Sequence, residues 1–280
     1  MRLGTFNLMH GRSITDGLVE TGRIGAAMAG LDADVLGLQE VDRAQPRSGH
    51  ADLTRLAADA LGAGHAMFVP AVVGTPGEAF RAATDADADG ADPHYGVALI
   101  SRFPVLEWRI TRLPAAPLRA PILIPGPPKR PAPANAGPTR MRMMLLDDEP
   151  RVLLAAVVAT PIGRMTIATT HLSFVPGWNV RQLQLVRRAL RALPAPRVLL
   201  ADLNLPGGLP RLFSGWHRLA GVPTYPSPAP QVQFDHVLAD RRGFERLPRV
   251  VDVASPRLPF SDHRPLIVTL RGRPGTLSLD

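Results

Sequence analysis

The sequence has no cysteine among its 280 residues. This absence excludes a disulfide scaffold, cysteine-ligated zinc fingers, iron–sulfur clusters and thiol nucleophiles. Aromatic residues are few, 5% in total, which argues against a surface that stacks the bases of single-stranded nucleic acid. The longest apolar run, from Val152 to Ala159, is far shorter than the ~20 residues that a membrane-spanning helix requires. The motifs of Walker loops, HExxH zinc proteases and GxSxG hydrolases are also absent.

Lysine is almost absent as well. Lys129 is the single lysine, so nearly all of the cationic charge is arginine. The 32 Lys+Arg residues exceed the 24 Asp+Glu residues and give a formal net charge of +8. This excess indicates either an anionic partner or a bias in genome composition, and the charge alone does not decide between them. Hydrophobic residues make up 45% and charged residues 20%, which is the composition of a folded globular protein.

The first residues contain no recognisable targeting segment. The stretch from Met1 to Asn7 lacks the apolar core of a signal peptide and has the pattern of a β-strand. We therefore expect a cytoplasmic protein without a membrane span, and we expect it to be a monomer.

Short β-rich runs outnumber helical patterns along the chain. The clearest helix begins near Asn179, where Leu183, Val186 and Leu190 share one face, and Pro194 ends it. Two further helices are expected at about Gly17–Ala29 and Ala51–Leu61. Strands are expected at Arg2–Leu8, Val35–Gln39, Phe68–Val73, Val97–Ser101, Val105–Leu113, Val152–Ala159, Met165–Leu172, Val198–Leu203, Phe234–Ala239 and Leu266–Leu270. This balance indicates sheets packed on each other with helices outside.

Two stretches interrupt the pattern. Asp85–Pro93 is an acidic loop that begins like a calcium-binding loop, but Gly96 stands where the bidentate glutamate belongs. Pro114–Pro138 contains nine prolines, from which we expect no regular structure and a long excursion from the domain. Strand patterns resume on both sides, so we expect a single domain over residues 1–280 with loop insertions at about 85–93 and 114–138.

Polar side chains suited to metal or phosphate chemistry recur at the ends of the apolar strands. Taken singly, each has an ordinary explanation as a turn residue or a structural histidine. Taken together, carboxylate, amide and imidazole groups without thiols suit a hard divalent cation, Mg²⁺ or Mn²⁺, better than zinc. The positions are Asn7, Glu40, His171, Asp202, Asn204, Asp235, Asp262 and His263.

Seven short motifs connect these positions to a known superfamily. They are Thr5-Phe-Asn7, Leu38-Gln-Glu40, Gly96-Val-Ala-Leu-Ile-Ser-Arg102, Thr170-His-Leu172, Ala201-Asp-Leu-Asn204, Phe234-Asp-His236 and Ser261-Asp-His-Arg-Pro265. In this order and spacing they resemble the motif series of the endonuclease/exonuclease/phosphatase superfamily, which has the deoxyribonuclease-I-like fold. The stretch 34–43 further resembles the small bacterial metal-dependent hydrolases of that superfamily. The resemblance implies an α/β (α+β) four-layer sandwich, with two face-to-face, mainly antiparallel sheets flanked by helices and a site at one end of the sheets.

The resemblance also implies a reaction, the metal-dependent hydrolysis of a phosphoester by water. Glu40 would be the principal ligand of a Mg²⁺ or Mn²⁺ ion. Asn7 and Asp262 would assist at the metal or at the phosphate. Phosphodiester hydrolysis builds negative charge on the oxygens around phosphorus, so a cation and fixed donors aimed at these oxygens stabilise the transition state.

The remaining candidates receive catalytic roles from the same resemblance. His263 would bind and polarise the phosphate, oriented by Asp235 through a carboxylate–imidazole hydrogen bond. Asp202 would activate or orient the attacking water, and Asn204 would position that water and bind the transition state. His171 would donate a hydrogen bond to a non-bridging oxygen.

Two alternatives stay open at the level of the sequence. Within the enzyme class, the substrate is a nucleic acid, an inositol phosphate, a phospholipid headgroup or another small phosphoester. The other class is a non-catalytic module that binds an anion or a partner on the same fold. All of the implied catalytic side chains are present, which favours the enzyme. The arginines of the 178–193 helix fall on its outer face and are typical of a solvated surface rather than of a DNA-binding groove.

Overall fold

The computed structural model describes residues 1–87, 90–117, 120–125, 141–146, 148–241 and 243–271. Over these residues the chain forms two large sheets and a separate two-stranded ribbon. The strand order of the first sheet is β14-β15-β1-β2-β5-β3-β4, and that of the second sheet is β12-β13-β11-β10-β9-β6. Each large sheet has one parallel pair, β1 with β2 and β10 with β11, and its other neighbouring strands are antiparallel.

The strands of the first sheet are β1 (Arg2–Asn7), β2 (Val35–Arg43), β3 (His65–Gly74), β4 (Phe80–Ala82), β5 (His94–Ser101), β14 (Arg249–Ala254) and β15 (Leu266–Arg271). Those of the second sheet are β6 (Val105–Leu113), β9 (Arg151–Thr160), β10 (Gly163–His171), β11 (Arg197–Asp202), β12 (His217–Arg218) and β13 (Asp235–Ala239). The ribbon consists of β7 (Ala120–Pro125) and β8 (Met141–Leu146).

The two large sheets pack face to face around a common apolar core. Side chains alternate between the two faces of a strand, so every second residue of the central strands faces the opposite sheet. Leu3 from the first sheet and Leu154, Ile167 and Leu200 from the second belong to this core, and each is 0% exposed. At about 25 cal/mol per Å² of apolar surface removed from water, such side chains each contribute roughly 1.5–3 kcal/mol to folding.

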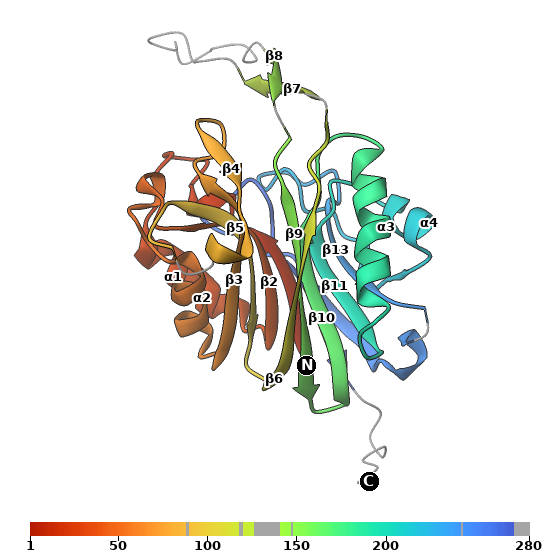
Figure 1. The fold of residues 1–280 in the computed structure, drawn as a ribbon. Helices are drawn as coiled ribbons and strands as arrows, with labels where there is room; N and C mark the ends of the chain where they lie inside the picture. Colours follow the sequence, from red (N-terminus) through yellow and green to blue (C-terminus); the bar gives the residue numbers. More distant parts are fainter. Residues whose placement is uncertain (88–89, 118–119, 126–140, 147, 242, 272–280) are drawn as a thin grey trace.

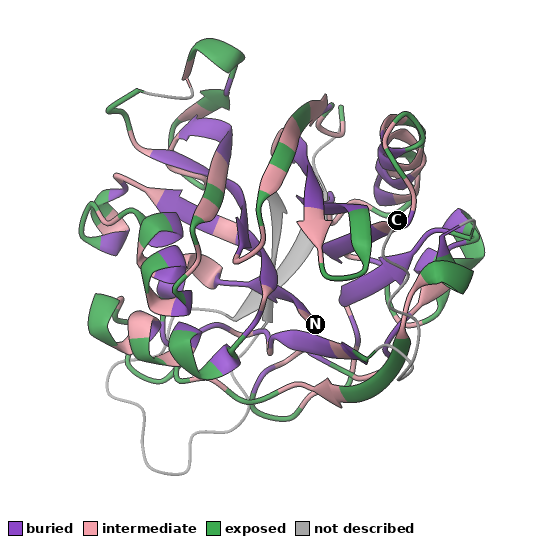
Figure 2. Cartoon of the chain, turned by 90° about the horizontal axis from the view of Figure 1, so that it is seen from below, coloured by how far each residue is buried: buried purple, intermediate pink, exposed green. Residues whose placement is uncertain are grey.

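Helices cover the outer face of each sheet and complete four layers (Figure 1). Ile24 and Leu53 anchor α1 (Thr21–Leu31) and α2 (Leu53–Leu61) on the first sheet. Leu183 and Val186 anchor α3 (Trp178–Leu190) on the second sheet. The remaining helical segments are α4 (Leu209–Ser214), η1 (Met9–Gly11), η2 (Pro46–Ser48), η3 (Asp85–Asp87) and η4 (Phe244–Arg246). Figure 2 shows the buried residues concentrated on the strands and on the inward sides of the helices. No helix of the described part of the chain is both long and apolar enough to cross a membrane.

The expected sandwich is confirmed, and a strand is present at each of the ten predicted places. The helices expected at Ala51–Leu61 and from near Asn179 also lie close to their expected bounds, as α2 and α3. The first helix begins later than expected, at Thr21 rather than at Gly17. Gly17 N donates to Ser13 O, and Ser13 N donates to Leu18 O. With a φ of 74° at Gly17, these residues form a tight turn instead of a first helical turn.

Three strands of the large sheets were not expected from the sequence. β4 and β12 have three and two residues, too few to show an alternating pattern. β14 is an edge strand in which Val250 and Val251 are exposed, so apolar character does not alternate with burial.

The expectation that Pro114–Pro138 holds no regular structure is wrong over Ala120–Pro125. These residues form β7 and pair antiparallel with β8, from Ala120 opposite Leu146 to Pro125 opposite Met141. A two-stranded ribbon leaves one edge of each strand free, and proline is tolerated where its nitrogen faces that edge. Pro121 and Pro125 are four residues apart, so both nitrogens face the same edge. Residues 88–89 of the predicted acidic loop and 118–119 and 126–138 of the proline-rich stretch lie outside the described residues.

Close packing between β3 and β5 leads to a prediction at Gly96. A Cβ atom at this position would lie 2.1 Å from Val69 O and 2.9 Å from Pro70 Cα, both backbone atoms that cannot rotate away. We expect Gly96→Ala to lower the free energy of unfolding by about 1–3 kcal/mol, the usual cost of overpacking. Urea unfolding followed by circular dichroism measures this change. Gly64→Ala is the matched control, because no atom lies within 4 Å of a Cβ built there. Equal stability of the two variants would contradict the prediction.

Candidate active site

Two strands of the second sheet end, and a third begins, with a polar side chain that faces the first sheet. Val198 and Leu200 of β11 lie in the core between the sheets, so Asp202, two residues further on, points into the same space. The register places Asp202 opposite His171 on β10 and opposite Asp235 on β13. The apolar part of each strand therefore holds one of these side chains at a fixed place. This end of the sandwich is the one from which β7 and β8 project in Figure 1.

Glu40 reaches the same place through an irregularity in β2. Leu36 and Leu38 face the helices, and the next residue to do so is Val41 rather than Glu40. The register with β5 shifts between Leu38 and Val41, and Glu40 has a φ of 54°. A bulge adds one residue to a strand and redirects its side chains, and a positive φ costs free energy for a residue that has a Cβ. Strain of this kind is concentrated at functional positions, which is consistent with the role expected for Glu40.

The amide of Asn7 joins carboxylates from the two sheets. Its Nδ2 donates to Glu40 Oε1 and to Asp202 Oδ2, each at 3.0 Å. Its Oδ1 accepts from Met9 N at 3.0 Å, which fixes the orientation of the amide. The side chain is buried on the core side of β1, the face that also carries Leu3. Asn7 thus holds the two carboxylates at a set separation.

A row of buried polar side chains lies next to Asn7, between the two sheets. Thr5 Oγ1 donates to Gln39 Oε1 at 3.2 Å, and Gln39 Nε2 donates to Thr169 Oγ1 of the second sheet at 2.9 Å. All three residues are 0% exposed. Buried polar groups that are satisfied in this way favour one relative position of the packed elements. The row therefore fixes the two sheets relative to each other next to the site.

Asp235 holds His263 in place. Asp235 Oδ2 accepts hydrogen bonds from His263 Nδ1 at 2.7 Å and from Thr224 Oγ1 at 2.6 Å. Burial alone would lower the pKa of His263, but the Asp235 carboxylate, helped by Asp202 and Asp262, raises it to about 10. His263 is therefore an imidazolium at neutral pH, and its Nε2 lies 3.8 Å from Asp202 Oδ2.

His171 and Asn204 contact Asp202 as well. His171 Nε2 lies 3.5 Å from Asp202 Oδ2, and Asn204 N donates to Asp202 Oδ1 at 3.0 Å. Asn204 Nδ2 donates to Leu172 O at 2.9 Å. Burial, followed by the nearby Arg151, holds the pKa of His171 well below its usual value. The site therefore contains one neutral and one charged histidine at neutral pH.

Carboxylates crowd this end of the sandwich. Burial raises the pKa of Glu40 to about 7 against the hydrogen bond from Asn7, and Asp262 and Glu149 raise it further. Burial likewise raises the pKa of Asp202 to about 6, opposed by the charge of His263. Raised carboxyl pKa values mean that the ionised forms are short of positive charge. A bound cation would supply that charge.

Two sets of side chains could hold such a cation. In the described part of the chain, Asp202, Asp235 and His263 have ligand atoms within 4.8 Å of one another. His263, however, bonds Asp235 through Nδ1, and the neighbouring carboxylates raise its pKa to about 10, so a metal at Nε2 would have to displace a proton. Glu40 and Asp262 instead offer carboxylate oxygens, which hard divalent cations prefer. The chemistry of this second set fits Mg²⁺ or Mn²⁺ better.

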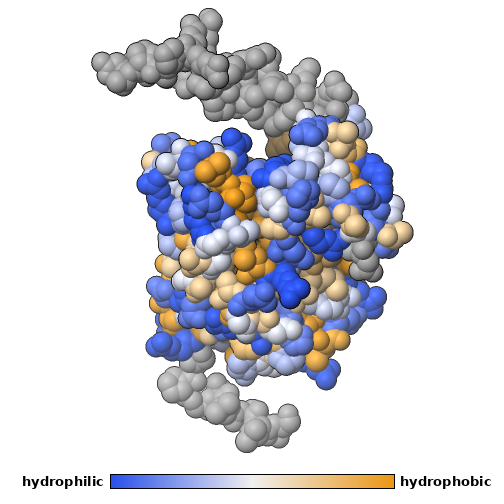
Figure 3. Space-filling view, turned by 90° about the vertical axis from the view of Figure 1, so that its left-hand side faces the viewer, coloured by the Kyte–Doolittle hydropathy of each residue, from blue (hydrophilic) through white to orange (hydrophobic). Residues whose placement is uncertain are grey.

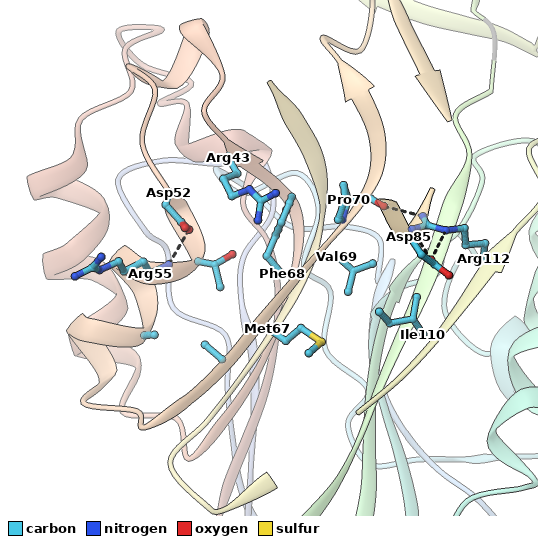
Figure 4. Close-up of a pocket in the computed structure, with 13 residues that line it drawn as sticks. Arg43, Asp52, Arg55, Met67, Phe68, Val69, Pro70, Asp85, Ile110 and Arg112 are labelled. Atoms are coloured by element: carbon cyan, nitrogen blue, oxygen red, sulfur yellow. Dashed lines mark hydrogen bonds and ion pairs between the residues drawn. The ribbon is translucent and has the colours of Figure 1, made fainter. Parts of the chain in front are cut away.

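A separate groove lies away from this cluster. It has a volume of about 460 Å³ and runs beside β3, between α2 and β6 (Figure 4). Met67, Val69 and Ile110 form apolar parts of its wall, and Arg112 pairs there with Asp85. None of the eight predicted site residues lines it. On the side of the molecule shown in Figure 3, hydrophilic side chains surround scattered apolar ones.

All eight residues predicted from the sequence lie at the same end of the sandwich. Seven are connected by the contacts above, and Asp262 precedes His263 and acts electrostatically on Glu40. Three further contributors were not predicted: Thr224, which bonds Asp235, and Glu149 and Arg151, which lie beside Glu40 and His171. Thr224 lies in a loop and Arg151 begins a strand, and neither belongs to a motif that could have indicated a role.

Comparison with known proteins connects this geometry to a family. The model of the Endonuclease/Exonuclease/phosphatase family matches residues 4–263. No curated protein matches the sequence. Among solved structures, an endonuclease/exonuclease/phosphatase from Beutenbergia cavernae aligns with a TM-score of 0.61 and 22% identity, over 96% of this chain and 70% of that chain.

Two other solved structures have more specific names. A mannosyl-6-phosphatase from Bacteroides thetaiotaomicron aligns with a TM-score of 0.55 and 16% identity, over 97% of this chain and 99% of that one. Sphingomyelinase C from Streptomyces griseocarneus aligns with a TM-score of 0.56 and 14% identity, over 97% and 99%. At 16% and 14% sequence identity, these alignments show that the chain shares the fold of the two proteins.

The pair of Asp235 and His263 leads to a prediction about stability and pH. The folded-state pKa of His263, about 10, lies above the unfolded value of 6.5. The stabilisation from this pair is therefore fully present below pH 6.5 and is lost as the pH rises through 10. We expect Asp235→Asn to cost roughly 3 kcal/mol near pH 6.5 and progressively less toward pH 10. Urea unfolding of metal-free protein across this range measures the difference.

Asp240→Asn is the matched control for this experiment. Asp240 is buried and pairs with Arg197 at 2.8 Å, and arginine keeps its charge throughout this pH range. Its cost should therefore stay constant from pH 6.5 to 10. A cost of Asp235→Asn that is equally constant would contradict the raised pKa of His263.

Proposed function

The chain belongs to the endonuclease/exonuclease/phosphatase family, and from this premise we propose that it hydrolyses a phosphoester bond with a divalent metal ion, Mg²⁺ or Mn²⁺. The observation that carries the proposal is the amide of Asn7, bonded to Glu40 and Asp202 at 3.0 Å each, beside a histidine that Asp235 keeps charged. Such a cluster is costly to bury, because each carboxylate loses its hydration. A cluster with this cost is explained if its charged groups bind a metal ion and an anionic substrate.

Glu40 and Asp262 are the side chains that would hold the metal, with Asn7 keeping Glu40 in place. A divalent cation in such a site neutralises charge on the phosphate and assists water or the leaving oxygen. Glu40 is restrained by its bulge and its hydrogen bond, so the oxygen donor is oriented before any ion arrives. Such preorganisation lowers the cost of reaching the reactive geometry.

Asp202 is the best placed group to accept a proton from the attacking water. Both of its oxygens are fixed, Oδ1 by Asn204 N and Oδ2 by Asn7 Nδ2. Its pKa of about 6 leaves it mostly ionised at pH 7 while making it a stronger base than an exposed aspartate. Asn204 follows directly on the strand and would position the water.

The two histidines would bind the phosphate from different directions. His263 carries a positive charge and would bind a non-bridging oxygen through Nε2, while Asp235 keeps its ring in place. His171 is neutral and would donate one hydrogen bond. Negative charge develops on the oxygens during hydrolysis, so these donors bind the transition state more tightly than the substrate.

A small phosphoester fits the surroundings of the site better than a long polyanion. Arg47 and Arg151 act on Glu40 electrostatically, and each pairs with a carboxylate of the protein. These arginines are therefore engaged within the fold rather than arranged along a groove for successive phosphates. The names of the mannosyl-6-phosphatase and sphingomyelinase C structures indicate that this fold serves phosphomonoesters and phosphodiesters.

Hydrolysis of model substrates tests the proposal. With Mn²⁺ or Mg²⁺, we expect the protein to cleave p-nitrophenyl phosphate or bis-p-nitrophenyl phosphate, and to lose this activity in EDTA. Glu40→Gln and Asp202→Asn should each lower kcat by about 10²–10³, since each removes one group that acts in the transition state. A panel of sugar phosphates, sphingomyelin and plasmid DNA, compared by kcat/KM, identifies the substrate class.

Glu245→Gln is the control, because Glu245 is an exposed carboxylate in η4, at the other end of β13 from Asp235. Its kcat should match that of the unchanged protein. No turnover of any phosphoester in either metal would refute the enzymatic function and leave a non-catalytic, anion-binding module.

A further inference from the structure

Arg151 is a buried arginine that makes contact with one of the candidate catalytic histidines. It is the first residue of β9 and lies opposite Leu113, the last residue of β6. Only 5% of its surface is exposed. Its Nη1 lies 3.2 Å from His171 Nδ1 and 3.3 Å from Glu149 Oε2, and its Nη2 lies 3.6 Å from Asp148 Oδ1. The guanidinium is thus placed between two carboxylates and an imidazole.

The chemistry of arginine determines which nitrogen of His171 carries the proton. A guanidinium has five N–H donors and no acceptor, and it keeps its charge in proteins. The nitrogen that faces it, Nδ1, must therefore be the acceptor. A neutral imidazole with a bare Nδ1 carries its proton on Nε2.

The groups around Nε2 leave this proton directed at the candidate site. Asn204 Nδ2 donates one hydrogen to Leu172 O, and its second hydrogen faces His171 Nε2 at 3.1 Å, where it would favour a bare Nε2. The guanidinium at Nδ1 is a charged donor and the amide a neutral one, so the hydrogen bond to Nδ1 is the stronger of the two and decides the tautomer. Asp202 Oδ2, at 3.5 Å, is the acceptor on this side. Nε2–H is thus available for an oxygen that arrives beside Asp202.

We propose that Arg151 is a positioning residue that fixes His171 as the Nε2–H tautomer, so that this ring presents a hydrogen-bond donor to the substrate phosphate. The reactive role rests on the proposed phosphoester hydrolysis, whereas the tautomer is a property of the protein itself. Without Arg151, both tautomers are accessible, and the Nδ1–H form presents a lone pair at Nε2. A lone pair there repels a phosphate oxygen.

The same arginine also contacts the base of the segment between β6 and β9, residues 114–150. Asp148 Oδ2 accepts from Ala116 N at 2.6 Å, and Asp148 is 6% exposed. Ala116 and Asp148, near the two ends of this segment, are therefore joined to each other beside Arg151. An ordinary ion pair would need only one carboxylate partner, and it would not require contact with an imidazole nitrogen.

Nitrogen NMR of the full-length protein tests the proposal. Long-range ¹H–¹⁵N spectra of the ¹⁵N-labelled protein distinguish the two neutral tautomers and the protonated ring, and His171→Gln assigns the signal. With Mg²⁺ and again in EDTA, we expect His171 to be the Nε2–H tautomer. In Arg151→Met the Nδ1–H or the protonated form should appear. The kcat should fall about 10–100-fold while KM changes less than about threefold.

Arg151→Lys and Arg197→Met complete the experiment. Lysine also donates to Nδ1, so Arg151→Lys should keep the tautomer and most of kcat. Arg197→Met removes a half-buried arginine that pairs with Asp240, and it should leave the spectrum of His171 unchanged. If Arg151→Met does not fold, the tautomer of His171 in the unchanged protein and in Arg151→Lys still tests the proposal.

Two results would overturn the proposal. One is an Nδ1–H tautomer of His171 in the unchanged protein. The other is an Nε2–H tautomer that persists in folded Arg151→Met. Failure of the proposed function is a separate result, because it shows as absent turnover in the unchanged protein whatever the tautomer is.

Discussion

The hydrogen bonds from one amide, Asn7 Nδ2, to Glu40 and to Asp202 are the contacts on which the candidate site depends. Glu40 comes from the first sheet and Asp202 from the second. Because both carboxylates bond the same nitrogen, they lie close together, and like charges repel strongly in a medium of low dielectric constant. The amide provides a donor to each carboxylate, and the imidazolium of His263 provides positive charge. The raised pKa values of Glu40 and Asp202 show that this compensation is incomplete. A divalent cation would complete it.

The apolar core between the sheets fixes the direction of the side chains at the strand ends. Because side chains alternate along β11, the buried Val198 and Leu200 determine that Asp202 points between the sheets. A close-packed protein core does not deform continuously, so the strand ends stay in register. Glu40 is the exception, since it needs a bulge and a φ of 54° to reach the site. Strain at Glu40 is tolerated because the strands on both sides of β2 are well paired.

The sequence predicted the sandwich, and its motif series indicated the candidate side chains that the structure places at one end of it. Apolar alternation explains the direction of Asn7, His171 and Asp202, whereas Glu40 depends on a bulge and Asp262 and His263 precede β15. Short and exposed strands such as β4 and β14 could not be predicted, since they show no alternation of burial. The ribbon strand β7 was not predicted, because the many prolines around it indicated an irregular segment despite its apolar residues. The contact of Arg151 with His171 was also missed, since it joins positions 20 residues apart through a guanidinium that belongs to no motif.

Anomalous diffraction from a crystal soaked in Mn²⁺ locates the metal ion without reference to activity. We expect one strong peak within about 2.5 Å of a carboxylate oxygen of Glu40, with Asp262 beside it and His263 still bonded to Asp235. The same soak of Glu40→Gln should show a weaker peak or none. A peak bound through His263 Nε2, or equal occupancy in the two crystals, would contradict the assignment of Glu40 as the principal metal ligand.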